Sequence, residues 1–260
     1  MKYGVVVGTQ RTGTTVLRSV LGTHPDIATF GEVFLNRHSN MKESYYGFLQ
    51  KAVAENSELV IPSSDNNQTL FTRYMSYLEE LCNPESECLT IDCKYNFLMG
   101  AMVPGELGIN RRPHLLHLFR LNNVKIIHLI RKDVLATYVS SLLSVKNQVW
   151  ATDDLKKLTT RSVVVPTENL VGQLQARVDE QNYFLSLLND VALTVAYEDM
   201  IVENEFSVEV MDKVAKLLSL ENKFDLEPRL KKMAPEKAES IQNYGEVQKC
   251  LKGTKFEQFL

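Results

Sequence analysis

The chain has 260 residues and a formal net charge of −3, from 29 basic and 32 acidic side chains. This length lies near the upper limit for one hydrophobic core, and 44% apolar with 23% charged residues is ordinary for a soluble globular protein. Because the charge is nearly balanced, it provides no general attraction to nucleic acid or to an anionic membrane. We therefore expect one domain over residues 1–260 with no nucleic-acid partner.

The N-terminal sequence, the lengths of the apolar runs and the cysteine spacing favour a cytoplasmic protein. The N-terminal MKYGVVVG ends its short apolar run in a glycine loop, unlike a signal peptide, and no later run approaches the ~18 apolar residues of a membrane span. The four cysteines show no paired C-x-x-C spacing, so we expect free thiols and no zinc site. None of these features indicates the oligomeric state.

Strand-like and helical patterns alternate along the chain. Most of the strand-like runs are continuously apolar, as expected of strands that are covered on both faces. Strands that alternate with helices form right-handed crossovers, so we predict an α/β, three-layer, P-loop-like fold with a central parallel sheet of about five strands flanked by helices. The predicted strands span residues 3–7, 26–30, 89–94, 124–130 and 192–197. The predicted helices span residues 14–21, 70–81, 134–145, 168–188 and 206–220.

Two polar segments interrupt this alternation. Residues 37–67 end within the polar run PSSDNNQ and include a predicted helix cap at Asn67. Residues 146–160 break helical periodicity and contain Trp150, the chain's single tryptophan. Long irregular segments in a compact domain are often lids or substrate loops. We predict that both are insertions on the substrate side of the domain.

The stretch VVVGTQRTGTTVL near the N-terminus reads as a phosphate-binding loop without its lysine. Gly8 and Gly13 have the G-x-x-x-x-G spacing of a Walker loop, and Thr15 holds the hydroxyl position. Thr14 replaces the lysine, whereas Arg11 places a cation inside the loop. Backbone N–H groups at a helix N-terminus bind phosphate or sulfate, and an arginine offers a planar fork to two oxygens. Without the lysine, hydrolysis of a nucleoside triphosphate is disfavoured, and a less charged transferable group is expected.

A second arginine ends a predicted strand. Arg131 follows residues 124–130, and Asp133 is a plausible N-cap of the next helix. Strand C-termini border the ligand crevice of an open parallel sheet, so Arg131 and Arg11 should face one cleft and suit a ligand with two anionic ends. One face of the following helix carries a column of hydroxyl groups, from Thr137, Ser140, Ser141 and Ser144.

The loop residues G-T-Q-R-T-G-T-T-x-L resemble the 5′-phosphosulfate loop of sulfotransferases that use 3′-phosphoadenosine-5′-phosphosulfate (PAPS). The resemblance is closest to soluble bacterial members, whose loops commonly read R-[ST]-G-[ST]-[ST]. It implies PAPS as the cofactor, adenosine 3′,5′-bisphosphate (PAP) as the product, and no metal. The implied ligands of the 5′-phosphosulfate are Arg11, Thr12, Gly13, Thr14 and Thr15.

The 3′-phosphate motif of this family is similar to the second arginine region. In the bacterial members an arginine that ends a strand is followed by a serine on the next helix, which implies Arg131 and Ser140 here. The animal enzymes have R-x-x-x-D, whereas Asp133 comes only two residues after Arg131. Alignment on the aspartate selects Thr137 instead of Ser140, so Thr137 stays an alternative.

Three residues are implied in catalysis. The G-E-x-F segment at Glu32 resembles the one that holds the catalytic glutamate of bacterial carbohydrate sulfotransferases, which makes Glu32 the expected base. His24 is the alternative, because histidine is the base in other branches of the family, although THPD also fits a helix end. Lys94, at the end of IDCK, resembles a lysine of related bacterial sequences and is expected at the sulfuryl group or the leaving phosphate.

Two later stretches, YEDM at 197–200 and NYGEV at 243–247, also resemble the bacterial family. The first is expected to anchor the last strand. The second predicts a C-terminal helix near the cofactor, with Lys249 or Lys252 as candidates for the 3′-phosphate. The R-K-G stretch of the cytosolic animal enzymes is absent.

These motifs together predict a sulfotransferase that acts by in-line displacement on a hydroxyl of a small-molecule, glycan, lipid or carrier-bound acceptor. One alternative is a Mg²⁺-dependent nucleotide or small-molecule kinase with a degenerate loop, for which Asp92 would be the metal ligand. Another is a non-catalytic nucleotide-binding module. The sequence does not identify the acceptor.

Overall fold

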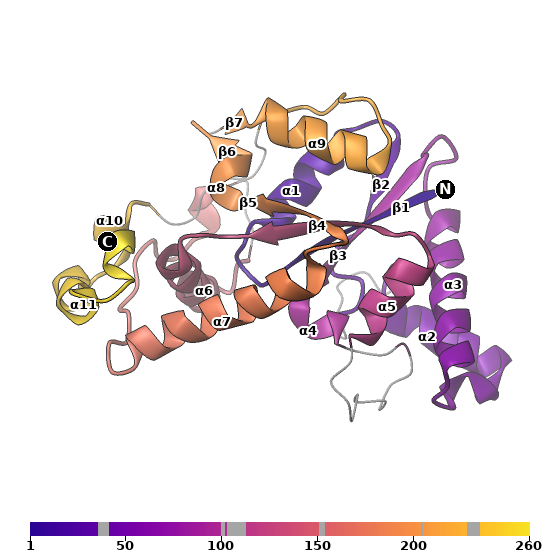
Figure 1. Cartoon of the computed structure of the whole chain (residues 1–260), viewed down its shortest axis with the longest axis horizontal. Coiled ribbons are helices and arrows are strands. Elements are labelled where there is room, and N and C mark those ends of the chain that lie inside the picture. The colour runs from indigo at the N-terminus through magenta and orange to yellow at the C-terminus, as the bar shows by residue number, and fades with distance from the viewer. Residues whose placement is uncertain (36–41, 100–101, 103–112, 151–153, 204, 228–234) are drawn as a thin grey trace.

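The computed structural model describes the chain apart from residues 36–41, 100–101, 103–112, 151–153, 204 and 228–234 (Figure 1). Within the described part, a parallel five-stranded sheet has the strand order β2-β3-β1-β4-β5, which confirms the predicted architecture. Its strands are β1 (Lys2–Gly8), β2 (Ile27–Thr29), β3 (Cys88–Lys94), β4 (Lys125–Ile130) and β5 (Ala192–Ala196). A separate antiparallel pair consists of β6 (Ile201–Val202) and β7 (Glu205–Phe206).

Helices cover both faces of the sheet (Figure 1). On one face lie α1 (Thr14–Leu21) and α9 (Val208–Leu218). The other face is covered by α2 (Tyr45–Glu55), α3 (Ser64–Glu80), α4 (Tyr95–Leu98), α5 (His114–Leu121), α6 (Val134–Asn147) and α7 (Leu170–Leu188). The remaining helices are α8 (Tyr197–Met200), α10 (Lys237–Ser240) and α11 (Tyr244–Leu251), with short 3₁₀ turns at Ser57–Val60, Leu155–Lys157 and Glu257–Phe259.

The central strand β1 shows why its sequence is continuously apolar. Val5 and Val7 pack in the same cluster as Leu70 of α3, whereas Val6 packs on the opposite face with Leu17 of α1. Alternate side chains of a strand point to opposite faces, so a strand with helices on both sides must be apolar at every position. Each of these buried side chains stabilises the fold by about 1.5–3 kcal/mol relative to an exposed one.

The segment before α3 differs from its prediction. The cap of α3 is Ser63, whose hydroxyl accepts from the N–H of Asn66 at 3.0 Å. Asn67, the predicted cap, lies inside the helix and accepts from the N–H of Met102 at 2.8 Å, so its amide serves a tertiary contact. Serine is as good a cap as asparagine, and the polar run PSSDNNQ therefore allowed both starting points.

The described part of residues 37–67 contributes to the core. Tyr45 and Phe48 of α2 lie with their ring centroids 5.2 Å from that of Tyr74 in α3. This segment interrupts the alternation of strands and helices along the sequence, yet it packs on α3 and contributes to the core. Its role as an acceptor-side insertion stays a prediction, as does the single-domain organisation.

Strand register determines which residues meet at the carboxyl edge of the sheet. Gly8 pairs with Lys94 of β3, and Val7 pairs with His128 of β4. The loop after β1 therefore lies between the ends of β3 and β4. The N-terminus of β1 lies at the other end of the sheet, away from α10 and α11 (Figure 1).

Candidate active site

The loop between β1 and α1 depends on its two glycines. Gly13 has φ of 96°, in the left-handed region, and a Cβ added there would lie 2.5 Å from Cδ2 of Tyr197. A Cβ on Gly8 would lie 2.7 Å from Oγ1 of Thr12 and 2.8 Å from the carbonyl oxygen of Leu129. Both approaches are closer than real Cβ contacts, so the G-x-x-x-x-G spacing is required by the local packing.

Lys94 brings a positive charge to the place where the loop lacks its lysine. Its Nζ donates to Oγ1 of Thr14, the residue at the Walker lysine position. The same Nζ lies 2.9 and 3.0 Å from the two carboxylate oxygens of Asp92 and 3.5 Å from Oε1 of Glu32. The side chain of Lys94 is only 5% exposed. A neighbouring strand therefore supplies the lysine ammonium group that the loop sequence lacks.

Glu32 reaches this cluster because strand pairing continues beyond β2. The N–H of Phe30 donates to the carbonyl of Thr90, and the N–H of Asp92 donates to the carbonyl of Gly31. These bonds hold the chain beside β3 as far as Gly31, and Glu32 follows directly. Its side chain is 31% exposed, so its carboxylate contacts both Lys94 and solvent.

The two arginines predicted to share a cleft lie next to each other. Nη1 of Arg131 donates to the carbonyl oxygen of Arg11 at 3.2 Å. Burial and then the positive charge of Arg131 lower the pKa of Arg11 to about 10, so Arg11 stays charged at neutral pH. Among the described residues, Nε of Arg131 is buried without a hydrogen-bond partner. Two adjacent cations, one with an unused buried donor, suit an anionic ligand.

The hydroxyl column on α6 separates into two kinds of residue. The hydroxyl groups of Thr137, Ser141 and Ser144 donate to backbone carbonyls four residues earlier in the chain. Oγ of Ser140 instead accepts from Nε of Arg11 at 3.0 Å. Ser140 contacts the other half of the site, whereas the hydroxyl of Thr137 bonds to the carbonyl of Asp133, which favours Ser140 of the two alternatives.

The side chain of Arg11 extends farther from its own loop than the sequence suggests. Besides contacting Ser140, it donates through Nη1 to the carbonyl oxygen of Trp150. The backbone of Arg11 has φ of 68°, in the left-handed region, which is uncommon for a residue other than glycine. A residue expected at the 5′ end of the ligand therefore bridges to the helix expected at the 3′ end and to the segment 146–160.

The YEDM segment holds the turn between β4 and α6. The carboxylate of Glu198 accepts from the backbone N–H groups of Lys132 and Asp133, each at 3.0 Å. The ring of Tyr197 lies under the guanidinium of Arg131, 4.6 Å from Cζ to the ring centroid. From the sequence this segment was predicted only to anchor the strand, because the cation–π contact depends on tertiary structure.

The C-terminal region meets the site through Lys237, a residue that the sequence did not predict there. Lys237 of α10 forms an ion pair with Asp133, with Nζ 2.6 Å from Oδ2. Lys249 and Lys252 are exposed. The predicted C-terminal helix is present as α11 and packs on the cluster that includes Leu135 of α6. A single lysine without a motif carried no signal that could have indicated Lys237.

His24 lies at the opposite edge of the sheet. It follows α1 and precedes β2, with its Nε2 2.9 Å from the carbonyl oxygen of Glu221 and its Nδ1 accepting from the N–H of Asp26 at 3.2 Å. The carbonyl of Asp26 in turn accepts from Glu87, beside the start of β1. The structure therefore does not bring His24 together with Lys94, whereas it does bring Glu32.

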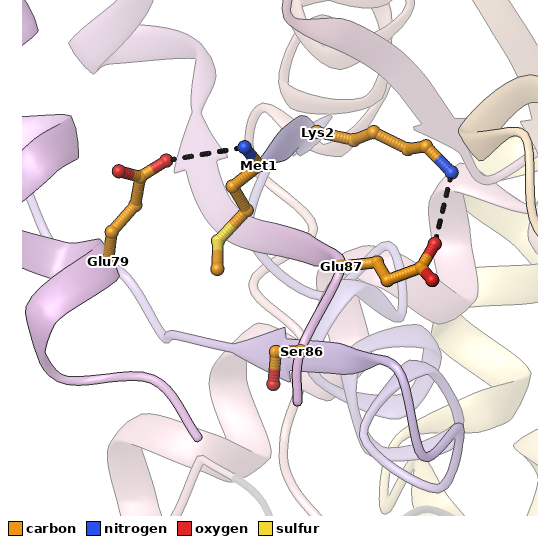
Figure 2. Close-up of a pocket in the computed structure, with 5 residues that line it drawn as sticks. All are labelled: Met1, Lys2, Glu79, Ser86 and Glu87. Atoms are coloured by element: carbon orange, nitrogen blue, oxygen red, sulfur yellow. Dashed lines mark hydrogen bonds and ion pairs between the residues drawn. The ribbon is translucent and has the colours of Figure 1, made fainter. Parts of the chain in front are cut away.

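A surface hollow at that same far edge is not part of the site. Figure 2 shows its lining residues, Met1, Lys2, Glu79, Ser86 and Glu87. The amino group of Met1 lies 3.8 Å from Glu79, and Nζ of Lys2 lies 3.4 Å from Glu87. These charged groups pair with one another at the start of β1, on the side of the sheet away from the glycine loop, so we assign no function to the hollow.

The described ranges contain neither a metal-binding cluster nor a membrane-spanning helix. No group of three or more His, Cys, Asp or Glu residues there is arranged to hold a metal ion. None of the helices in the same ranges combines the length and the hydropathy needed to cross a bilayer.

The fold and the site define the class of protein: a three-layer α/β protein with a P-loop-like turn and basic side chains gathered at the carboxyl ends of its strands. The model of the sulfotransferase family matches residues 5–221, and the chain belongs to that family. Members of this family generally use PAPS as the sulfuryl donor. No curated protein matches the chain in sequence.

Proposed function

We propose that the protein transfers the sulfuryl group of PAPS to a hydroxyl of a small-molecule, glycan, lipid or carrier-bound acceptor, with Glu32 as the base. The observation that carries this proposal is the meeting of Thr14, Lys94 and Glu32 at the end of β1. It places a cation and a partly exposed carboxylate beside an anion-binding turn. A cytoplasmic location is part of the same proposal.

The residues present fit a nucleotide with two anionic ends. The turn from Arg11 to Thr15 would hold the 5′-phosphosulfate through backbone N–H groups at the start of α1. Arg131 and Ser140 would hold the 3′-phosphate. The fit rests on the buried, unpartnered Nε of Arg131 and on the burial and neighbouring positive charge that lower the pKa of Arg11, because an anion between the two arginines would pair with both.

Glu32 and Lys94 divide the chemistry between them. When bound, PAPS supplies a sulfuryl group whose S–O bond to the 5′-phosphate breaks as the acceptor oxygen bonds to sulfur. The carboxylate of Glu32 takes the proton of the acceptor hydroxyl, for which its partial exposure leaves access. The ammonium of Lys94, fixed at Thr14, stabilises negative charge that develops at the turn.

The kinase alternative is less well supported by the same residues. It requires Asp92 as a Mg²⁺ ligand, but both carboxylate oxygens of Asp92 accept hydrogen bonds from Nζ of Lys94. A carboxylate that is already engaged by a buried ammonium is poorly suited to bind a cation.

Ligand-dependent melting separates the proposed functions. PAP at 100 times its dissociation constant should stabilise the protein by about 2.7 kcal/mol, whereas ATP with Mg²⁺ should not. A larger shift with ATP and Mg²⁺ would favour the kinase. Binding of PAP, together with no transfer from labelled PAPS to a wide panel of phenols, sugars and lipids, would favour the non-catalytic module.

The role of Glu32 is tested by the variant Glu32→Gln, with the separate variant His24→Gln as its control. We expect Glu32→Gln to lower turnover by roughly 10² or more while PAP still binds, since the substitution removes the proton acceptor and keeps the shape. His24→Gln should retain turnover, because His24 lies at the far edge. The reverse pattern would make His24 the base.

A further inference from the structure

Two carboxylates face the ammonium group of Lys94, and their contacts are unequal. Asp92 contacts Nζ with both oxygens, at 2.9 and 3.0 Å, whereas the nearest oxygen of Glu32 is 3.5 Å away. Hydrogen bonds between charged groups have donor–acceptor distances of about 2.7–2.9 Å. The close partner of Lys94 is therefore Asp92, and Glu32 makes the weaker contact.

Burial makes the same distinction. The side chain of Asp92 is 2% exposed, and its backbone lies within β3, paired with Val6 and donating to the carbonyl of Gly31. Glu32 follows the end of a three-residue strand and is 31% exposed. Asp92 is thus a fixed counter-ion, whereas Glu32 can exchange its contact with Lys94 for a contact with a ligand.

We propose that Asp92 is a positioning residue of the transfer reaction. It holds the ammonium of Lys94 against Thr14 and, by occupying that ammonium, keeps the carboxylate of Glu32 available to the acceptor hydroxyl. This inference rests on the proposed function. It adds a residue that touches neither PAPS nor acceptor and acts through Lys94 and Glu32.

The charge balance explains why Asp92 is needed. One ammonium faces two carboxylates, so one of them is left without a full partner. If Asp92 were neutral, Glu32 would be the one remaining carboxylate within ion-pair distance of Nζ among the residues that the structure describes. Lys94 would then pair tightly with Glu32, move away from Thr14, and hold the base in a salt bridge.

Asp92→Asn therefore should lower kcat about tenfold or more with less than a threefold change in KM for PAPS. The small change in KM is expected because Arg11, Arg131 and Ser140 are outside the cluster. The assay measures formation of PAP from PAPS with the hydroxyl compound that the acceptor panel identifies. Turnover at the wild-type rate would overturn the inference.

A double-mutant cycle separates positioning from a general loss of structure. We expect Asp92→Asn to have a large effect in the wild-type background and a clearly smaller one in the Glu32→Gln background, because part of the action of Asp92 is through Glu32. Equal fold losses in both backgrounds would overturn the inference. Wild-type protein that forms no PAP from PAPS would instead refute the proposed function.

A second pair of variants covers the case in which Asp92→Asn fails to fold with Lys94 left unpaired. Lys94→Met and the uncharged double variant Asp92→Asn/Lys94→Met should turn over PAPS at the same rate, since Asp92 has no role once Lys94 is gone. Thermal melting with and without PAP verifies that both are folded. A further loss in the double variant would mean that Asp92 acts on the reaction directly, which contradicts the inference.

Discussion

The guanidinium of Arg11 donates through Nε to the hydroxyl oxygen of Ser140, 3.0 Å away, and so joins the turn after β1 to the helix after β4. The two motifs are 129 residues apart in sequence. They meet because β1 and β4 are neighbours in a parallel sheet and end at the same edge. The contact makes the turn and the helix parts of one proposed binding site.

Ser140→Ala should weaken PAP binding by roughly 10- to 100-fold, since a hydrogen bond to a charged group contributes about 1.5–3 kcal/mol. Calorimetric titration with PAP measures the loss. Ser141→Ala is the matched control, because its hydroxyl bonds to the carbonyl of Thr137 in its own helix. Equal affinities for the two variants would remove Ser140 from the 3′-phosphate site.

Arg131→Ala should weaken binding of PAP far more than binding of adenosine 5′-phosphosulfate, because only PAP carries a 3′-phosphate. Both dissociation constants can be measured by competition with a fluorescent nucleotide. Lys132→Ala is the control: its ammonium is exposed and pairs with Asp199. Similar losses for the two nucleotides would show that Arg131 binds the common 5′ end.

The sequence was sufficient for the sheet because its strands are buried on both faces. A continuous apolar run such as VVV at residues 5–7 favours a strand that is covered on both faces, and all five predicted strands are present. The helix α5 was not predicted. Its buried residues, Leu115, Leu116, Leu118 and Phe119, occur as two adjacent pairs in a segment of only eight residues, too short to establish a helical period.

Parts of the site that depend on a local sequence motif were predictable. Parts that depend on contacts between residues distant in sequence were not. The glycine spacing indicated the turn, and strand ends indicated Glu32, Lys94 and Arg131. The contact of Arg11 with Ser140 and the stacking of Tyr197 on Arg131 depend on side chains from segments that are far apart in the sequence. No spacing rule specifies where a long arginine side chain ends.

Gly13→Ala should abolish PAP binding and lower the melting temperature. A Cβ at φ of 96° is strained, and it would lie 2.5 Å from the ring of Tyr197, which itself supports Arg131. The matched control is Gly245→Ala in α11, where an added Cβ meets nothing within 4 Å. That substitution should leave PAP binding unchanged and keep or raise the melting temperature, since alanine favours a helix over glycine. Loss of binding in both variants would point to a nonspecific effect.

Stability should fall on acidification because of His128. Its side chain is completely buried on β4, with Nε2 2.6 Å from the hydroxyl of Tyr95, and burial lowers its pKa from the ordinary 6.5 to about 4. The unfolded chain therefore binds a proton that the folded chain does not between these two values. The contribution of neutral His128 to stability is fully present above pH 6.5 and is lost as the pH falls toward 4. About 2 kcal/mol of it is lost between pH 7 and pH 5.

Chemical denaturation at a series of pH values measures this loss. His128→Gln should flatten the dependence between pH 7 and pH 5, at the cost of lower stability at pH 7, because the substituted side chain does not titrate. His117→Gln is the control, since His117 is exposed on α5 and should leave the dependence unchanged. An equally steep dependence in His128→Gln would mean that other groups bind the protons, and that burial of this imidazole does not limit the acid stability of the fold.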